Sequence, residues 1–289
     1  MPTSTHSHRI SKPPSKRGSR RASRKTSQPA TPPLQTTRQP EQPTTPTNEP
    51  LVERTNSLSL EEFTRLYVQN EDLGITNGSS SPDGPHPPPP SSSEQQQQQQ
   101  QQHQYKIDIF TASTIPDPLF EQCFHLIETT SAEAYRASSI GWSPPKKRKE
   151  MKLPDMKYLV LRRATTSGSG AADVADDADT TFNVLGFLSF MVTYEDGFEV
   201  VYCYEVHLSA AVQRQGLGAQ LMRVFLRIGE RVGMQKAMLT VFRANGAAIR
   251  FYERLGFEVD ESSPRPRRLR NGTVKDPDYR ILSRVYRRE

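Results

Sequence analysis

The sequence predicts an α+β fold for residues 105–289, preceded by a largely disordered extension of residues 1–104. Short segments that alternate in polarity or are rich in β-branched residues, such as 106–111 and 236–242, are typical of strands. Segments with apolar residues at helical spacing, such as 118–135, lie between them. The extension is mostly Ser, Thr, Pro, Gln and charged residues, which bury too little apolar surface to offset the entropy of ordering.

The extension has two features of its own. The chain carries a net charge of +6, and residues 9–25 contain Arg and Lys but no acidic residue. We expect this basic arm to contact nucleic acid, a ribosome or an import receptor, or else to be a solvated tail without a partner. The runs at 87–90 (Pro) and 95–102 (Gln) are low-complexity sequence of the spacer type.

Residues 59–68 predict a short helix within the extension. Ser59 and Glu62 have the spacing of a capping box, and Leu60, Phe63 and Tyr67 recur at helical intervals. Such a short helix is marginal alone, so it either docks onto the folded domain or fluctuates free in solution.

From residue 105 the expected elements follow in order. Residues 106–111 alternate as a strand, 118–135 carry an apolar helical stripe, and a polar, Gly-rich and Ala-rich loop at 165–181 follows the strand at 157–163. Asp196-Gly197 is a strong hairpin signal between strands. The remaining expected strands are 183–194, 199–208, 236–242, 257–259 and 278–284, and the remaining helices are 218–232 and 244–255.

Residues 202–221 hold the most informative motif. A strand rich in aromatic residues leads through a turn to Gly216 and Gly218, where an amphipathic helix begins. Glycines allow successive backbone N–H groups to point into one concavity, and the helix N-terminus adds partial positive charge, so the motif predicts a phosphate-binding loop. No Lys-Ser/Thr pair and no third glycine follow, which excludes a nucleotide P-loop and the dinucleotide fingerprint.

Two motifs together resemble the GCN5-related N-acetyltransferase (GNAT) family. The first is Gln-Arg-Gln-Gly-Leu-Gly at 213–218, and the second places Asn245, Ala248, Tyr252 and Gly256-Phe257 at the family's spacing. The resemblance implies a mixed central sheet that splays at a cofactor cleft, flanking helices, and acetyl-CoA as cosubstrate without a metal. The cofactor-binding residues that it implies are Val206, His207, Leu208, Arg214, Gln215, Gly216, Leu217, Gly218, Ala219, Asn245 and Ser262.

A narrower resemblance, over about 105–286, is to the N-alpha-acetyltransferase D (NatD) family. It is carried by 202–205 (Tyr-Cys-Tyr-Glu), 239–242, 260–264 and 281–284. It implies acetyl transfer to the N-terminal amine of histones that begin Ser-Gly-Arg-Gly. The residues that it assigns to the peptide site are Tyr135, Trp142, Tyr204, Thr240 and Tyr279. By residue count Thr193 stands where relatives have an acid near the peptide arginine, and Glu195, Asp196 or Glu199 are candidate substitutes.

The chemistry depends on the target amine. An α-amine with a pKa near 8 costs only about 1.4 kcal/mol to deprotonate at pH 7, so a modest base is enough. Glu205 is the expected base, with Tyr204 as the alternative, and a β-bulge in the strand would bring both to the cleft. Tyr252 is either the acid for the leaving thiolate or a core residue. Cys203 as a covalent nucleophile is disfavoured, because a small buried residue fits there equally well.

The same motifs are compatible with other functions. A GNAT enzyme acting on lysine or a small amine, and a non-catalytic acetyl-CoA-binding adaptor, are the alternatives to an N-terminal acetyltransferase. Lys146-Lys147-Arg148-Lys149 resembles a nuclear import signal on a surface helix. The two cysteines are not spaced as a metal site, and no apolar run reaches the roughly 20 residues of a membrane span. We therefore expect a monomer of the cytoplasm and nucleus with no membrane contact.

Overall fold

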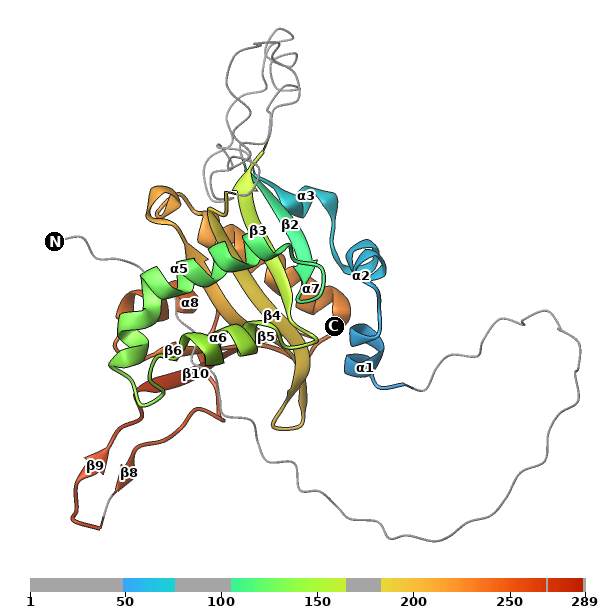
Figure 1. The fold of residues 1–289 in the computed structure, drawn as a ribbon. Coiled ribbons are helices and arrows are strands. Elements are labelled where there is room, and N and C mark those ends of the chain that lie inside the picture. Colours follow the sequence, from blue (N-terminus) through green and yellow to red (C-terminus); the bar gives the residue numbers. More distant parts are fainter. Residues whose placement is uncertain (1–48, 76–104, 165–182, 269, 288–289) are drawn as a thin grey trace, which may run out of the picture.

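The computed structural model describes residues 49–75, 105–164, 183–268 and 270–287 (Figure 1). An eight-stranded mixed sheet in the order β1-β2-β3-β4-β5-β6-β10-β7 forms the centre, and its paired neighbours are antiparallel except for β5 and β6. These strands are β1 (Gly74–Ile75), β2 (Tyr105–Thr111), β3 (Lys157–Arg163), β4 (Gly186–Glu195), β5 (Phe198–Leu208), β6 (Lys236–Phe242), β7 (Glu258–Val259) and β10 (Tyr279–Val285). The predicted α+β fold with a mixed central sheet is confirmed.

Helices cover both faces of this sheet. The helices are α1 (Leu51–Asn56), α2 (Leu60–Tyr67), α3 (Asn70–Leu73), α5 (Asp117–Arg136), α6 (Pro144–Met151), α7 (Leu217–Val232) and α8 (Gly246–Arg254). In Figure 1, α5 and α6 cross one face. The apolar residues of α7, α8 and the N-terminal helices join a different core cluster, on the other face. A separate hairpin of β8 (Arg267–Arg268) and β9 (Val274–Lys275) extends from the body.

The side chains of β4 show how alternation separates the two faces. Phe187 joins the core cluster that lies under α5, whereas Leu188 and Phe190 join the larger cluster that includes α7. Successive strand residues point to opposite faces, so a strand with helices on both sides is apolar throughout. This explains why β4 reads as a nearly continuous apolar run.

The pairing of β5 with β6 is short. Their parallel register runs from Val200 opposite Lys236 to Cys203 opposite Leu239 and ends there. Beyond this point the rest of β5 pairs with β4, while β6 continues alongside β10. The two central strands therefore separate at the C-terminal half of β5, which is the splay that the GNAT resemblance implied.

The N-terminal elements begin before the predicted boundary at residue 105. The capping box of Ser59 and Glu62 is present, and α2 buries Phe63 completely in the core cluster. In α3, Asp72 pairs with Arg227 and Arg231 of α7. The sequence reading missed α1, α3 and β1, because each of them is too short to show a periodic pattern and owes its order to packing on the sheet.

Several predictions fall outside the described residues. These are the basic arm at 9–25, the Pro and Gln runs at 87–90 and 95–102, and the loop at 165–181. Within the part of the chain that the structure describes, no helix has both the length and the apolar character needed to span a membrane.

Candidate active site

A cavity of about 590 Å³ lies beside the splay, within the range of small-molecule sites. Its wall includes most of the predicted cofactor residues: Val206, His207, Leu208, Arg214, Gly216, Gly218 and Ala219. It also includes residues that the sequence reading missed, among them Thr130 of α5, Arg223 of α7, and Phe251 and Arg254 of α8. Arg223 stands one helical turn after Ala219, so helical spacing from the glycine loop was a usable signal for it. Thr130 had no such signal, because it comes from a distant element.

Four predicted cofactor residues do not line this cavity. Leu217 is buried in the core, and the Gln215 side chain bonds the Tyr105 hydroxyl and the Ala211 carbonyl. Asn245 caps α8 by accepting from the Ala248 N–H, and its buried amide nitrogen has no hydrogen-bond partner among the described residues. Ser262 donates to Asp260, next to the edge strand β7, so the structure does not bring it to the cavity.

The glycine loop has the backbone shape of an anion site. Arg214 and Gly216 both have positive φ, 62° and 80°, and Gly216 is the N-cap of α7. Alternation between left-handed and ordinary backbone turns neighbouring N–H groups toward one side, where the helix N-terminus adds positive charge. A Cβ on Gly218 would stand 3.4 Å from Leu208 and 3.8 Å from Phe251, both of which line the cavity. The loop therefore fits the phosphates of a coenzyme A ester.

A β-bulge lies at Tyr204, as expected. Ser189 pairs with Glu205 and Phe190 pairs with Cys203, which leaves Tyr204 as the extra residue of β5. Tyr202, Tyr204, Glu205 and His207 consequently all face the α5 and α6 side, where Tyr204 packs edge-on against Tyr202. Strict alternation would have sent Glu205 to the opposite face.

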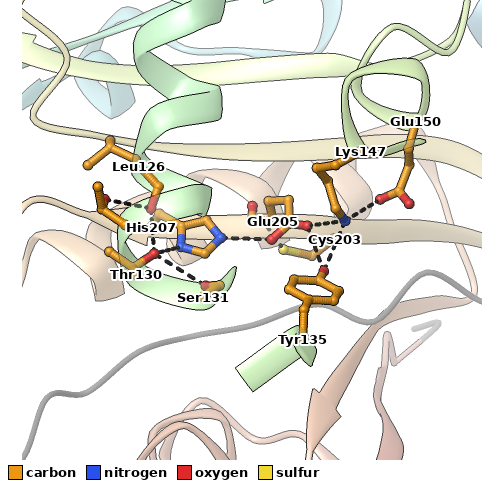
Figure 2. Close-up of polar contacts among 10 residues, drawn as sticks. Leu126, Thr130, Ser131, Tyr135, Lys147, Glu150, Cys203, Glu205 and His207 are labelled. Atoms are coloured by element: carbon orange, nitrogen blue, oxygen red, sulfur yellow. Dashed lines mark hydrogen bonds and ion pairs between the residues drawn. The ribbon is translucent and has the colours of Figure 1, made fainter. Parts of the chain in front are cut away.

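Glu205 is the centre of a buried polar network (Figure 2). Its Oε1 accepts from Lys147 Nζ at 2.8 Å and from the Tyr135 hydroxyl at 3.1 Å, and its Oε2 lies 2.7 Å from His207 Nε2. The other ring nitrogen of His207 lies 2.7 Å from the Thr130 hydroxyl. Thus α5, α6 and β5 each contribute to one chain of polar contacts that ends at the cavity wall.

The charges in this network determine how the carboxylate titrates. Burial by itself raises the pKa of Glu205, but the Lys147 ammonium and the His207 ring outweigh it and lower this pKa to about 2. Burial lowers the pKa of Lys147, yet Glu205, Tyr135 and Glu150 raise it well above the ordinary value. Burial and the Glu205 charge raise the pKa of the Tyr135 hydroxyl far above its usual range. Glu205 and Lys147 are therefore both ionised at neutral pH.

This network corrects the interpretation of the basic run at 146–149. The run does lie on a helix, α6, but Lys147 is only 5% exposed and points to Glu205. Arg148 pairs with Glu121 and stacks on the Phe124 ring. An import receptor binds accessible cations, and in this run only Lys146 and Lys149 are exposed. Sequence alone could not distinguish the buried lysine from the exposed ones, since all the residues of a basic run look alike.

The predicted peptide-site residues gather on the same face of the splay. The Tyr135 ring lies 5.6 Å from Trp142 and 5.4 Å from Phe242, and Trp142 also stacks on Phe124. Tyr204 and Tyr279 pack against the same two core clusters, and the Thr240 hydroxyl bonds Tyr202. The polar network thus has the aromatic cluster at its Glu205 end and the cavity at its His207 end.

Two candidate catalytic residues belong to the other core. Tyr252 is 2% exposed and packs against Phe251 and Phe257, and it does not line the cavity. Cys203 is buried in the same cluster, on the face away from Glu205, where its Sγ lies 3.7 Å from the Glu205 carbonyl oxygen. These positions suit core residues. They support the expectation that Cys203 is no nucleophile.

The acid candidates near Thr193 also divide by face. Thr193 pairs with Val200 and Glu195 with Phe198, so Glu195 shares a face with Thr193 and with the peptide-site aromatics. Glu199 pairs with Tyr194 on the opposite face, where Tyr194 bonds Glu53 of α1. Of these two, Glu195 is the better substitute for the missing acid.

Comparison with known proteins agrees with this geometry. Residues 133–257 match the acetyltransferase (GNAT) family, a segment that contains Tyr135, the splay and the glycine loop. This part of the chain is therefore similar to the GNAT acetyltransferases. Acetyltransferases of this family use acetyl-CoA.

A curated relative and two solved structures are similar to this chain. N-alpha-acetyltransferase 40 of Saccharomyces cerevisiae is 32% identical over 170 residues, which are 52% of this chain and 55% of the relative, so the match spans about half of either protein. A GCN5-related N-acetyltransferase from Kribbella flavida is 16% identical with a TM-score of 0.43, and covers 62% of this chain and 98% of its own. The ribosomal-protein-S18-alanine N-acetyltransferase from Escherichia coli is 20% identical with a TM-score of 0.39, covering 62% and 93%.

Proposed function

We propose that this protein is an acetyl-CoA-dependent N-alpha-acetyltransferase of the NatD type. The observation that carries the proposal is the position of Glu205, whose network joins the coenzyme A cavity to the cluster of aromatic residues on the substrate side. The likeness to N-alpha-acetyltransferase 40 supports the same activity. Acetyl-CoA supplies a thioester carbonyl, and an amine on the aromatic side attacks it across the splay.

Different residues are proposed to bind the pyrophosphate and the pantetheine arm of acetyl-CoA. The loop 214–219 and the α7 N-terminus hold the pyrophosphate, with Arg223 and Arg254 as further cations on the cavity wall. The backbone of Val206, His207 and Leu208 lies beyond the end of the β5–β6 pairing and is proposed to hold the pantetheine arm as an added strand would, with a backbone N–H there polarising the thioester oxygen. Direct transfer follows, without a covalent enzyme intermediate.

The role of Glu205 changes from the sequence-based expectation. Because Lys147 and His207 hold the pKa of Glu205 below its ordinary value, this carboxylate is a poor acceptor for the proton of an α-amine, whose pKa is near 8. Both Glu205 oxygens already accept hydrogen bonds. We therefore propose that Glu205 acts through its fixed charge, and that the substrate amine loses its proton to water at the cost of about 1.4 kcal/mol at pH 7.

The proposed substrate is a histone terminus that begins Ser-Gly-Arg-Gly, which such an enzyme meets in the cytoplasm or nucleus. A small, flexible and cationic peptide suits a site lined by Tyr135, Trp142, Tyr204 and Tyr279, because aromatic faces attract cations. Glu195 shares this face and is proposed to read the arginine. The protein is proposed to act as a monomer.

One experiment separates this function from its competitors. The full chain is incubated with acetyl-CoA and a histone tail peptide that carries both a free N-terminus and lysines, and the acetylated position is read by tandem mass spectrometry. We expect acetyl on the α-amine. Acetyl on a lysine would make the protein a lysine acetyltransferase, and binding of acetyl-CoA by calorimetry without transfer to any amine would make it an adaptor.

A matched peptide tests the specificity. The same peptide with its N-terminus blocked by formylation keeps every lysine and should not react. A peptide with the arginine at position three replaced by glutamine should react more slowly, and the Glu195→Gln variant should reduce that difference between the two peptides. Equal rates for all three peptides would contradict an N-terminal substrate.

A further inference from the structure

The hydrogen atoms of the buried network can be assigned from its geometry. Lys147 has three N–H donors, and they are directed at Glu205, at the Tyr135 hydroxyl and at Glu150. The Tyr135 hydroxyl accepts from Lys147 and so donates its own hydrogen to Glu205. Glu205 beside this ammonium is an ionised carboxylate, which only accepts. Its second oxygen therefore requires a hydrogen on His207 Nε2, 2.7 Å away.

The other nitrogen of His207 must also carry a hydrogen. The Thr130 hydroxyl has a single hydrogen, and it is donated to the Leu126 carbonyl at 2.5 Å, since a carbonyl has none to give (Figure 2). The Thr130 oxygen is thus an acceptor toward His207 Nδ1, at 2.7 Å. With hydrogens on both ring nitrogens, His207 is an imidazolium cation.

The charged groups around this ring balance one another. Glu205 of β5, and Lys147 and Glu150 of α6, give with His207 two cations and two anions. On the α5 side the His207 ring faces Thr130, and Ser131 and Tyr135 complete the network. On the β4 side Phe187 stacks on the His207 ring. The other titratable group near Glu205 is Tyr158 of β3. A buried charge that lacked such compensation would be costly, so the balanced set supports the assignment.

This cation lies where acetyl transfer needs an acid. His207 and Thr130 both line the coenzyme A cavity, beside the backbone of Val206 and Leu208. We propose that His207, held as an imidazolium by Glu205, is the acid that protonates the departing coenzyme A thiolate through the Thr130 hydroxyl, with Lys147 as a positioning residue. The inference deepens the proposed acetyltransferase function and rests on it.

The step is balanced in atoms and charge. A bond forms from the amine nitrogen to the acetyl carbon, the C–S bond breaks, and its electron pair leaves with sulfur. The Thr130 hydroxyl turns its hydrogen from the Leu126 carbonyl to sulfur and gives it up there. The hydroxyl oxygen takes the hydrogen of His207 Nδ1, which leaves a neutral ring that still donates from Nε2 to Glu205. The nitrogen loses its proton to water, and His207 regains one from water when the free thiol leaves the cavity.

The protonation state is tested without catalysis. The full chain is labelled with ¹⁵N-histidine, and the His207 ring signals are assigned by their loss in His207→Gln. At pH 7 we expect both ring nitrogens to carry hydrogens in the wild type, and only one in Glu205→Gln, where the anion is gone. A neutral ring in the folded wild type would overturn the proposal whether or not the protein acetylates anything.

The acid role is tested by turnover. Thr130→Val removes the hydroxyl with little change in shape and is expected to lower kcat about 10²-fold, as is His207→Gln, without weakening acetyl-CoA binding measured by calorimetry. Thr130→Ser restores a hydroxyl and should recover most of the rate. Thr129→Val is the matched control, because Thr129 makes the same bond to a carbonyl four residues back, His125, but is exposed and reaches the network only by a longer contact of 3.3 Å to the Leu126 carbonyl.

The outcomes are distinct. Wild-type kcat in folded Thr130→Val and His207→Gln would overturn the proposal, as would an equal loss in Thr130→Val and Thr130→Ser. Absence of transfer by the wild-type chain to every amine would instead remove the proposed function, and the ring signals would then still decide whether His207 is the cation assigned here.

Discussion

The Lys147 ammonium lies 2.8 Å from the Glu205 carboxylate, and neither side chain is more than 5% exposed. This contact joins α6 to β5 across the core. Removing one partner of a buried pair leaves the other charge uncompensated. Lys147→Met is therefore expected to lower the free energy of unfolding by about 3–5 kcal/mol, measured by urea denaturation.

The neighbouring Lys146 provides the control for that change, because it is exposed on the same helix. Lys146→Met should change stability by less than about 0.5 kcal/mol. The double variant Lys147→Met with Glu205→Gln leaves no unpaired charge at this contact and should recover part of the loss. If Lys147→Met and Lys146→Met were equally stable, the buried ion pair would not exist in solution.

Glu205 also predicts how stability depends on acid. Its pKa is about 2 in the folded protein and about 4.3 when unfolded, so between these values the unfolded state binds more protons. The stabilisation is fully present above pH 4.3 and is lost as pH falls toward 2. The loss is on the order of 3 kcal/mol in the wild type and should be absent in Glu205→Gln. Unfolding free energies at several pH values measure it, and parallel curves for both proteins would contradict the low pKa.

Gly218 tests the assignment of the coenzyme A cavity. The residue lies on the cavity wall in the first turn of α7, so Gly218→Glu places a long anion where phosphate is expected. Acetyl-CoA binding should become undetectable by calorimetry while the melting temperature stays close to that of the wild type. Gly218→Ala is the steric control, since a Cβ there meets Leu208 at 3.4 Å, and it should bind far better than Gly218→Glu. Unchanged binding by Gly218→Glu would refute the site.

Phe63 tests whether the N-terminal helices belong to the folded unit. Its side chain is fully buried against the sheet, and its ring lies 6.5 Å from that of Phe190. Phe63→Ala should cost about 3–5 kcal/mol of unfolding free energy. Leu66→Ala, on the same helix with 49% exposure, should cost much less. Similar midpoints in urea for the two variants would mean that α2 does not dock.

The order of strands and helices after residue 105 could be read from the sequence, because it depends on local patterns. The strands 157–163 and 236–242 have the predicted bounds, and α5, α7 and α8 differ from prediction by one or two residues at their ends. Asp196-Gly197 turns the β4–β5 hairpin as expected, with positive φ at both residues. The glycine loop was equally readable, since its shape is set by nearest neighbours.

What the sequence determined about this protein is therefore the order of its longer strands and helices after residue 105, its glycine loop and its likeness to acetyltransferases. Only the tertiary structure decided that Lys147 is buried, that Ser262 lies away from the cavity, and that Thr130 and His207 meet. Thr130 and His207 are 77 positions apart, and Lys147 and Glu205 are 58 apart. The neighbouring sequence of a threonine or lysine looks the same whether its hydroxyl or ammonium group is exposed to solvent or buried in a core. Its partner, and hence its charge and its chemistry, is fixed only when helix α5 and helix α6 pack on β5.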